Sequence, residues 1–210
     1  MKFFSPDGAL YKFISKLWDI IQLSVFWILF SIPVITFGGA TVAAFKVTNL
    51  MACDNEGYIF REFFNTFKKE FRNGIVHGLL FLIGLYCLYL DWQITLNASA
   101  YEGLLLAFSV IATAVFYALF VFSFSLRAGF NNSLVKTLKN SYRICIRYFG
   151  RVIIMTLALA LEFLIFDWNT LMLMIGLFVA PGFAMYTISS FAIPIYRQID
   201  EENKSGDADE

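Results

Sequence analysis

The chain has 210 residues, of which 59% are hydrophobic, 19% aromatic and only 15% charged, and its formal net charge is zero. A soluble domain is about 45–50% apolar and about 25% charged, so this composition excludes an ordinary soluble domain and indicates a protein that lies in lipid. The charge balance gives no reason to expect a nucleic-acid partner. Cys53, Cys87 and Cys145 form no CxxC pair, which argues against a disulfide framework or a zinc site.

Lysine and arginine occur on only one side of each long apolar stretch. Except for Lys46, they fall into four patches: 2–16, 61–72, 127–151 and 197–204. The gaps at 91–102 and 166–170 contain none. Because basic residues that flank membrane spans stay in the cytoplasm, this pattern predicts a multi-pass membrane protein with both termini cytoplasmic.

The apolar stretches predict an all-α fold, a polytopic membrane protein in a single domain (1–198) with about six crossing helices, since about 20 residues cross the hydrocarbon core. The predicted spans are 17–37, 40–52, 75–92, 104–126, 152–166 and 171–196. No uninterrupted apolar core precedes Leu17, so no removable signal peptide is expected. The acidic stretch 199–210 is expected to be a disordered, solvated cytoplasmic tail.

The first two spans are joined by helix-breaking residues. Pro33, followed by Gly38 and Gly39, predicts a kink or break near the far end of the first span. Basic patches lie both before this span and after Gly57, so the chain must return, and 40–52 is the only segment available. Because this segment is short and contains Lys46, it is either a tilted helix packed within the bundle or the second arm of a hairpin that turns at Pro33–Gly39.

Two amphipathic segments are expected to lie in the cytoplasmic interface, at 58–73 and 131–148. In the first, phenylalanines recur at intervals of three and four between charged residues: Phe60, Phe63, Phe64, Phe67 and Phe71. The order of inward span, basic helix and outward span occurs at 40–90 and again at 104–166, which suggests a parallel duplication. Composition alone can also produce such a similarity.

Three ionisable residues within or beside the spans are candidates for function: Asp19, Lys46 and Glu162. Glu162 either has a functional role or lies in a helix contact or near the outer interface. Lys46 either pairs with Asp19 or Glu162, or extends toward the cytoplasmic headgroups, which its position near Cys53 favours.

Small residues and prolines predict where helices pack or bend. Gly74 and Gly78 form a GxxxG pattern that permits close helix approach, and Pro181-Gly182 should bend the last span. His77 is the only histidine, so a metal site is not expected. The basic residues Arg127, Arg143, Arg147 and Arg151 could bind anionic lipid headgroups at the cytoplasmic face, although topology alone also explains them.

The residues that carry catalysis in common enzymes are absent. The sequence has no phosphate-binding loop, no GxSxG, no HExxH and no histidine near a candidate nucleophile. We therefore expect neither an enzyme nor a cofactor.

Three stretches of the N-terminal part resemble the YesL-like family of uncharacterised bacterial integral membrane proteins. They are Leu17-Trp18-Asp19, 33–41 (PVITFGGAT) and 56–71 (EGYIFREFFNTFKKEF), and Pro181-Gly182 is similar to a feature of that family. The resemblance implies a protein of the cytoplasmic membrane, often encoded beside carbohydrate-uptake and sensor components. No site residues are established for that family, so none are transferred to this chain.

Two functions follow as expectations. The first is a non-catalytic accessory protein that binds a sugar ABC transporter permease or a membrane sensor. The second is a small transporter or channel for a sugar-related molecule, which would need a polar route through the bundle. Asp19, Gln22, Lys46, Glu162 and the helix breaks at Pro33 and Pro181 are the only material in the sequence for such a route. The sequence does not define the oligomeric state.

Overall fold

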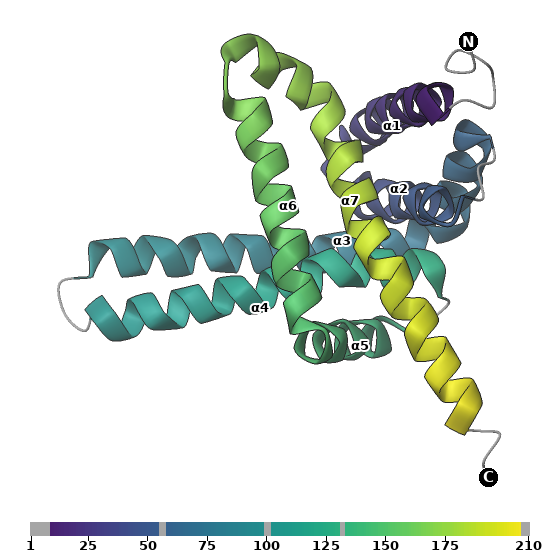
Figure 1. Cartoon of the computed structure of the whole chain (residues 1–210). Helices are drawn as coiled ribbons and strands as arrows, with labels where there is room; N and C mark the ends of the chain where they lie inside the picture. The colour runs from purple at the N-terminus through teal and green to yellow at the C-terminus, as the bar shows by residue number, and fades with distance from the viewer. Residues whose placement is uncertain (1–8, 55–57, 99–101, 131–132, 207–210) are drawn as a thin grey trace.

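The computed structural model describes residues 9–54, 58–98, 102–130 and 133–206 (Figure 1). Over these ranges the chain is helical except at short connections between the helices, and no strand occurs in them. The elements are α1 (Ala9–Ser31), η1 (Val34–Thr36), α2 (Phe37–Ala52), α3 (Ile59–Asn97), α4 (Glu102–Gly129), α5 (Leu134–Arg147), α6 (Phe149–Asp167) and α7 (Thr170–Gly206).

Among the described residues, 6 helices are long and apolar enough to cross a membrane: α1, α2 together with η1, α3, α4, α6 and α7. Many of their large apolar side chains are exposed, as expected where lipid is the solvent. The predicted fold, an all-α polytopic membrane protein with about six crossing helices, is confirmed.

The centre of the bundle is α2, the predicted return segment. Its residues from Gly38 to Phe45 are all buried, and α1, α3, α4 and α7 pack around it. Glycine and alanine in this stretch leave room for neighbouring helices to approach closely. At about 1.5 Å per residue α2 is shorter than the hydrocarbon core is thick, which suits a helix surrounded by protein.

A short turn joins α1 to α2, so the two helices form a hairpin that also packs within the bundle. The helices break at residues 32–36, and Gly38 and Gly39 lie inside α2. The N–H of Thr36 donates to the carbonyl of Pro33 (2.8 Å), and its hydroxyl lies 2.6 Å from the carbonyl of Phe30. These bonds satisfy backbone groups that the break would leave unpaired.

The predicted separation of an interfacial helix (58–73) from a span (75–92) is wrong, because α3 runs without a break from Ile59 to Asn97. The polar composition around Asn73-Gly74 suggested a boundary. In the structure Gly74 remains helical and forms a close backbone contact with α2. The phenylalanines near the start of α3 pack on Phe26 and Phe30 of α1, with ring centroids 4.9–6.2 Å apart in five pairs.

Two helical hairpins extend from the packed region. In Figure 1, α3 and α4 lie side by side as a long antiparallel pair that extends to the left. The α6–α7 pair extends in a different direction, toward the top of the view. The outer parts of both hairpins are apolar and exposed. In the first they include Ile83, Leu85, Leu96, Leu104, Phe108 and Ile111, and in the second Leu157, Leu161, Phe163, Leu164, Leu171 and Met174.

The two copies of the suggested duplication differ in structure. In the first copy the basic segment is continuous with the outward span as α3. In the second copy α5 ends at Arg147, and Tyr148 (φ −112°, ψ 34°) separates it from α6. The predicted amphipathic helix 131–148 is therefore α5, while residues 131–132 lie outside the described residues.

The last helix is longer than predicted. α7 continues to Gly206, so the prediction of a disordered tail from residue 199 is wrong over 199–206, and 207–210 lie outside the described residues. The acidic residues at 200–202 are tolerated in a helix that has passed beyond the apolar segment. Pro181 lies inside α7, and so does Pro194, which the sequence analysis did not single out.

Candidate functional site

The three ionisable candidates do not form one site. Asp19 lies on α1, Lys46 on α2 and Glu162 on α6, and all three are half-buried. The carboxylate of Glu162 accepts a hydrogen bond from the hydroxyl of Thr187 on α7. Glu162 therefore joins two helices, which corresponds to the helix-contact alternative. In the described part of the chain, no ion pair links Lys46 with Glu162.

The four glycines singled out from the sequence lie together where α2 crosses α3. A Cβ atom added to Gly38 would lie 2.0 Å from the carbonyl oxygen of Gly74 and 2.6 Å from the Cα of Gly78. A Cβ atom on Gly74 would lie 2.5 Å from the Cα of Gly39. The backbones are thus in direct contact, and only glycine fits at Gly38, Gly74 and Gly78.

Pro181 and Gly182 lie where α7 meets α1. Because proline has no N–H, the carbonyl of Leu177 loses its usual donor in the helix. One residue further on, the N–H of Gly182 donates to the hydroxyl oxygen of Ser24 on α1, 2.9 Å away. The same hydroxyl lies within donating distance of the carbonyls of Ile20 (3.0 Å) and Val179 (3.1 Å). Ser24 thus supplies side-chain hydrogen bonds at a weakened point of a membrane helix.

Buried polar side chains hold α2 to its neighbours. The hydroxyls of Thr48 on α2 and Ser189 on α7 lie 2.7 Å apart. The side chain of Asn49 both donates to the carbonyl of Ser125 on α4 and accepts from its hydroxyl, each at 3.1 Å. These pairs satisfy polar atoms that would otherwise be costly to bury. Sequence analysis missed them because serine and threonine are common in apolar helices.

His77 forms a similar interhelical contact. Its side chain is fully buried, and Nε2 lies 3.0 Å from the hydroxyl of Ser123 on α4. The ring packs against Phe81 and Phe124, with centroids 5.2 and 4.5 Å away. The geometry is that of a histidine packed in the core.

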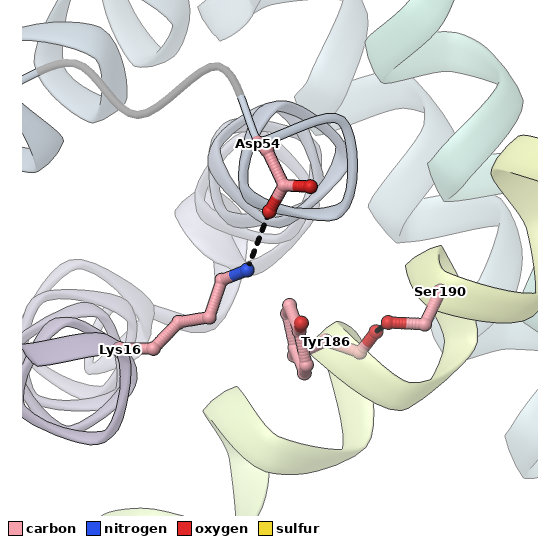
Figure 2. A network of polar contacts seen from close by, with 4 residues as sticks. All are labelled: Lys16, Asp54, Tyr186 and Ser190. Atoms are coloured by element: carbon pink, nitrogen blue, oxygen red, sulfur yellow. Dashed lines mark hydrogen bonds and ion pairs between the residues drawn. The ribbon is translucent and has the colours of Figure 1, made fainter. Parts of the chain in front are cut away.

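Figure 2 shows a polar junction of three helices. The Nζ of Lys16 on α1 lies 2.9 Å from Oδ1 of Asp54, which follows α2, and 5.8 Å from the ring centre of Tyr186 on α7. The ring of Tyr186 lies beside this ion pair, and the hydroxyl of Ser190 donates to the Tyr186 carbonyl (2.8 Å). Lys16 lowers the pKa of Asp54, first through the hydrogen bond and then through its charge.

A second ion pair joins the basic ends of α3 and α4. The Nη2 of Arg127 lies 3.0 Å from Oε2 of Glu70, and the two side chains are only 10% and 13% exposed. The sequence analysis treated Arg127 as a possible lipid ligand. In the structure it pairs with a carboxylate of its own chain, and this contact brings the basic patches of the two helices together.

Two comparisons with known proteins bear on the family. Residues 20–92 match the family described as "Protein of unknown function, DUF624". The chain is similar to the "Uncharacterized protein YesL" of Bacillus subtilis (strain 168), with 32% identity over 126 residues. The resemblance to the YesL-like family is confirmed. The YesL alignment covers 57% of this chain and 60% of the relative, less than two thirds of its length.

The match to DUF624 runs from Ile20 to Trp92, so it covers about half of α1, all of α2 and most of α3. It therefore includes the glycine crossing of α2 and α3. It does not include Glu162, α5 or the part of α7 that contacts Ser24. No solved structure matches this chain.

Proposed function

We propose that this protein is a non-catalytic accessory component of an assembly in the bacterial cell membrane. Its partner is a carbohydrate-uptake permease of the ABC type or a membrane sensor. One observation carries the proposal: Thr48, Asn49 and His77 form hydrogen bonds to neighbouring helices, whereas the apolar faces of the α3–α4 and α6–α7 hairpins are exposed. Such a bundle offers contact surfaces at its periphery in place of a polar route through its centre.

The orientation in the membrane is part of the proposal. The pair formed by Glu70 and Arg127 holds the basic beginning of α3 beside the basic end of α4. Basic residues at one level of the bundle support cytoplasmic ends for these helices and cytoplasmic termini for the chain. The resemblance to the YesL-like family, with its implied neighbours in carbohydrate uptake and sensing, supports the class of partner.

The proposal is tested by isolating the chain from its native membrane after brief crosslinking, in mild detergent. Stoichiometric recovery of permease or sensor subunits supports the accessory function. As a control for association that forms only after lysis, membranes without the tagged chain are solubilised without crosslinker, and the tagged chain is added afterwards. The crosslinker concentration is one that captures the subunits of a known permease. Recovery of the chain alone at that concentration contradicts the accessory function.

A second candidate, a transporter, is favoured by one observation. The helix α7 is weakened at Pro181, where Ser24 of α1 bonds to its backbone, and interrupted helices form substrate sites in several transporter folds. The two candidates are distinguished by the substitutions Glu162→Ala and Lys46→Ala. The accessory function predicts unchanged solute uptake in cells. Loss of uptake with the chain still folded in the membrane favours the transporter.

A further inference from the structure

A cavity of about 430 Å³ lies between the end of α4, the helix α5 and the last part of α7. Its polar side is formed by Asn140, Arg143 and Arg147 of α5 and by Asp200 of α7. The two arginines and one aspartate leave a formal charge of +1 among these lining side chains. The cavity therefore favours an anion that also has a hydrogen-bonding group for the amide or the carboxylate.

The other lining residues of the cavity are mostly apolar. They include Leu126 of α4, Phe130 just after the end of α4, and Tyr196 of α7. The rings of Phe130 and Tyr196 pack edge to face, with centroids 5.8 Å apart, and Leu126 and Tyr196 are almost completely buried. A ligand that fills this cavity contacts charge on one side and hydrocarbon on the other.

The outer surface of α5 is suited to the boundary between membrane and water. Its polar residues Thr137 and Ser141 are buried against the bundle, while Val135, Tyr142 and Ile146 are exposed. At 100° per residue these three exposed apolar side chains share one face, and Lys136, Lys139, Arg143 and Arg147 lie on the adjoining face. Such an arrangement is typical of a helix in the interface, with apolar residues in lipid and cations at the headgroups.

Arg147 is partly positioned by an aromatic ring. Its Cζ lies 5.7 Å from the ring centre of Tyr148, and the Cζ of Arg151 lies 5.4 Å from the same ring. Contact with the ring restricts the guanidinium groups, which reduces the loss of side-chain freedom when an anion binds.

We propose that this cavity binds the phosphate group of an anionic phospholipid. The guanidinium groups of Arg143 and Arg147 hold the phosphate, since arginine presents paired donors that match its oxygens. The beginning of the lipid's acyl region lies against Leu126, Phe130 and Tyr196. A cavity of this volume holds a headgroup and the adjoining glycerol, with the acyl chains continuing into the surrounding bilayer. This site does not depend on the accessory function proposed above.

The test compares lipid binding by the purified full-length chain and its variants. The probe is phosphatidylglycerol, titrated in detergent and detected by native mass spectrometry, with phosphatidylcholine as the zwitterionic reference. In the pocket variant Arg143→Gln/Arg147→Gln we expect affinity for phosphatidylglycerol to fall by about tenfold or more, because charge-assisted hydrogen bonds are lost. The matched control Lys136→Gln/Lys139→Gln removes the same charge from α5 at residues that do not line the cavity, and it should bind almost as wild type.

Two further arms decide the nature of the site. Arg143→Lys/Arg147→Lys keeps the charge but loses the paired donors, so it should bind with intermediate affinity. Soluble glycerol phosphate should bind far more weakly than the lipid, because it cannot use the apolar side. Equal lipid binding by the pocket variant and wild type, an equal loss in the matched control, or equal binding of soluble glycerol phosphate would each overturn the proposal. Both arginines are exposed at the surface, and a thermal unfolding scan checks that each variant is folded.

Discussion

The N–H of Gly182 on α7 donates a hydrogen bond to the hydroxyl of Ser24 on α1, 158 residues earlier in the chain. The contact lies next to Pro181, where the helix lacks one of its own donors. A Cβ atom on Gly182 would lie 2.3 Å from the Ser24 oxygen, so the glycine permits the approach and the serine uses it. The first and last spans are thus joined beside Pro181 of α7.

Replacement of Ser24 by alanine should destabilise the protein by about 1 kcal/mol, since the buried hydrogen bond between Ser24 and the Gly182 N–H is lost. Thermal unfolding in detergent measures the effect. Ser190→Ala is the matched control, because its hydroxyl bonds only within α7, to the carbonyl of Tyr186. Equal stability of the two variants would contradict the function assigned to Ser24.

Replacement of Gly78 by leucine should disrupt the crossing of α2 and α3. The new side chain would meet the backbone of Gly38 at 2.6 Å, and overpacking of this kind costs at least about 1–3 kcal/mol. Size-exclusion chromatography of the detergent extract measures the folded fraction. Gly150→Leu has open space around its Cβ position and should give a wild-type profile. A wild-type profile for Gly78→Leu would exclude this crossing.

The ion pair of Lys16 and Asp54 predicts a dependence of stability on pH. Because the pKa of Asp54 is lowered in the folded state, its contribution is present above the unfolded value of 3.8 and is lost as the pH falls through the folded value. The Tm difference between wild type and Asp54→Asn should therefore be present at neutral pH and disappear in acid. The difference should be small, since Asp54 is 87% exposed.

The partner variant Lys16→Met gives the control for this prediction. If the ion pair is the cause, Asp54→Asn in the Lys16→Met background should leave the Tm unchanged at neutral pH. An undiminished effect in that background would show that Asp54 acts through another contact.

Burial raises the pKa of the Cys145 thiol to about 11, and the group bonds to the carbonyl of Ala118 at 3.6 Å. At pH 8 almost none of it is thiolate, so a maleimide should leave Cys145 unmodified in the folded protein and react after denaturation. Mass spectrometry of the digested protein identifies the labelled site. Cys53, half-buried at the end of α2, is the internal control. Labelling of Cys145 as fast as Cys53 in the folded protein would contradict the packing of α5.

The sequence indicated which individual residues are structurally important, but it did not indicate which residues of other helices they contact. Gly38, Gly74 and Pro181 were singled out because glycine and proline have few other reasons to occur in a span. The sequence could not reveal that Gly38 faces Gly74 or that Ser24 faces Gly182. Such contacts depend on how helices far apart in the chain are arranged, and hydropathy is insensitive to that arrangement.

Polarity was a poor guide to two features. The charged residues around Asn73 suggested a helix boundary, but an apolar helix can continue into a charged segment, and α3 does so without a break. The acidic residues from 199 onward suggested a disordered tail, but α7 continues as a helix to Gly206. In both cases charged residues marked the end of the apolar segment and not the end of the helix.

Photocrosslinking from the exposed hairpins in native membranes tests the central proposal most directly. A photoreactive phenylalanine analogue is placed at Ile111 of α4 (63% exposed) and at Leu161 of α6 (60% exposed). Trp18 of α1, 62% exposed and outside both hairpins, is the matched control position. The accessory function predicts a discrete adduct with a permease or sensor subunit from at least one hairpin, in higher yield than from Trp18. Lipid adducts alone from all three positions would contradict it.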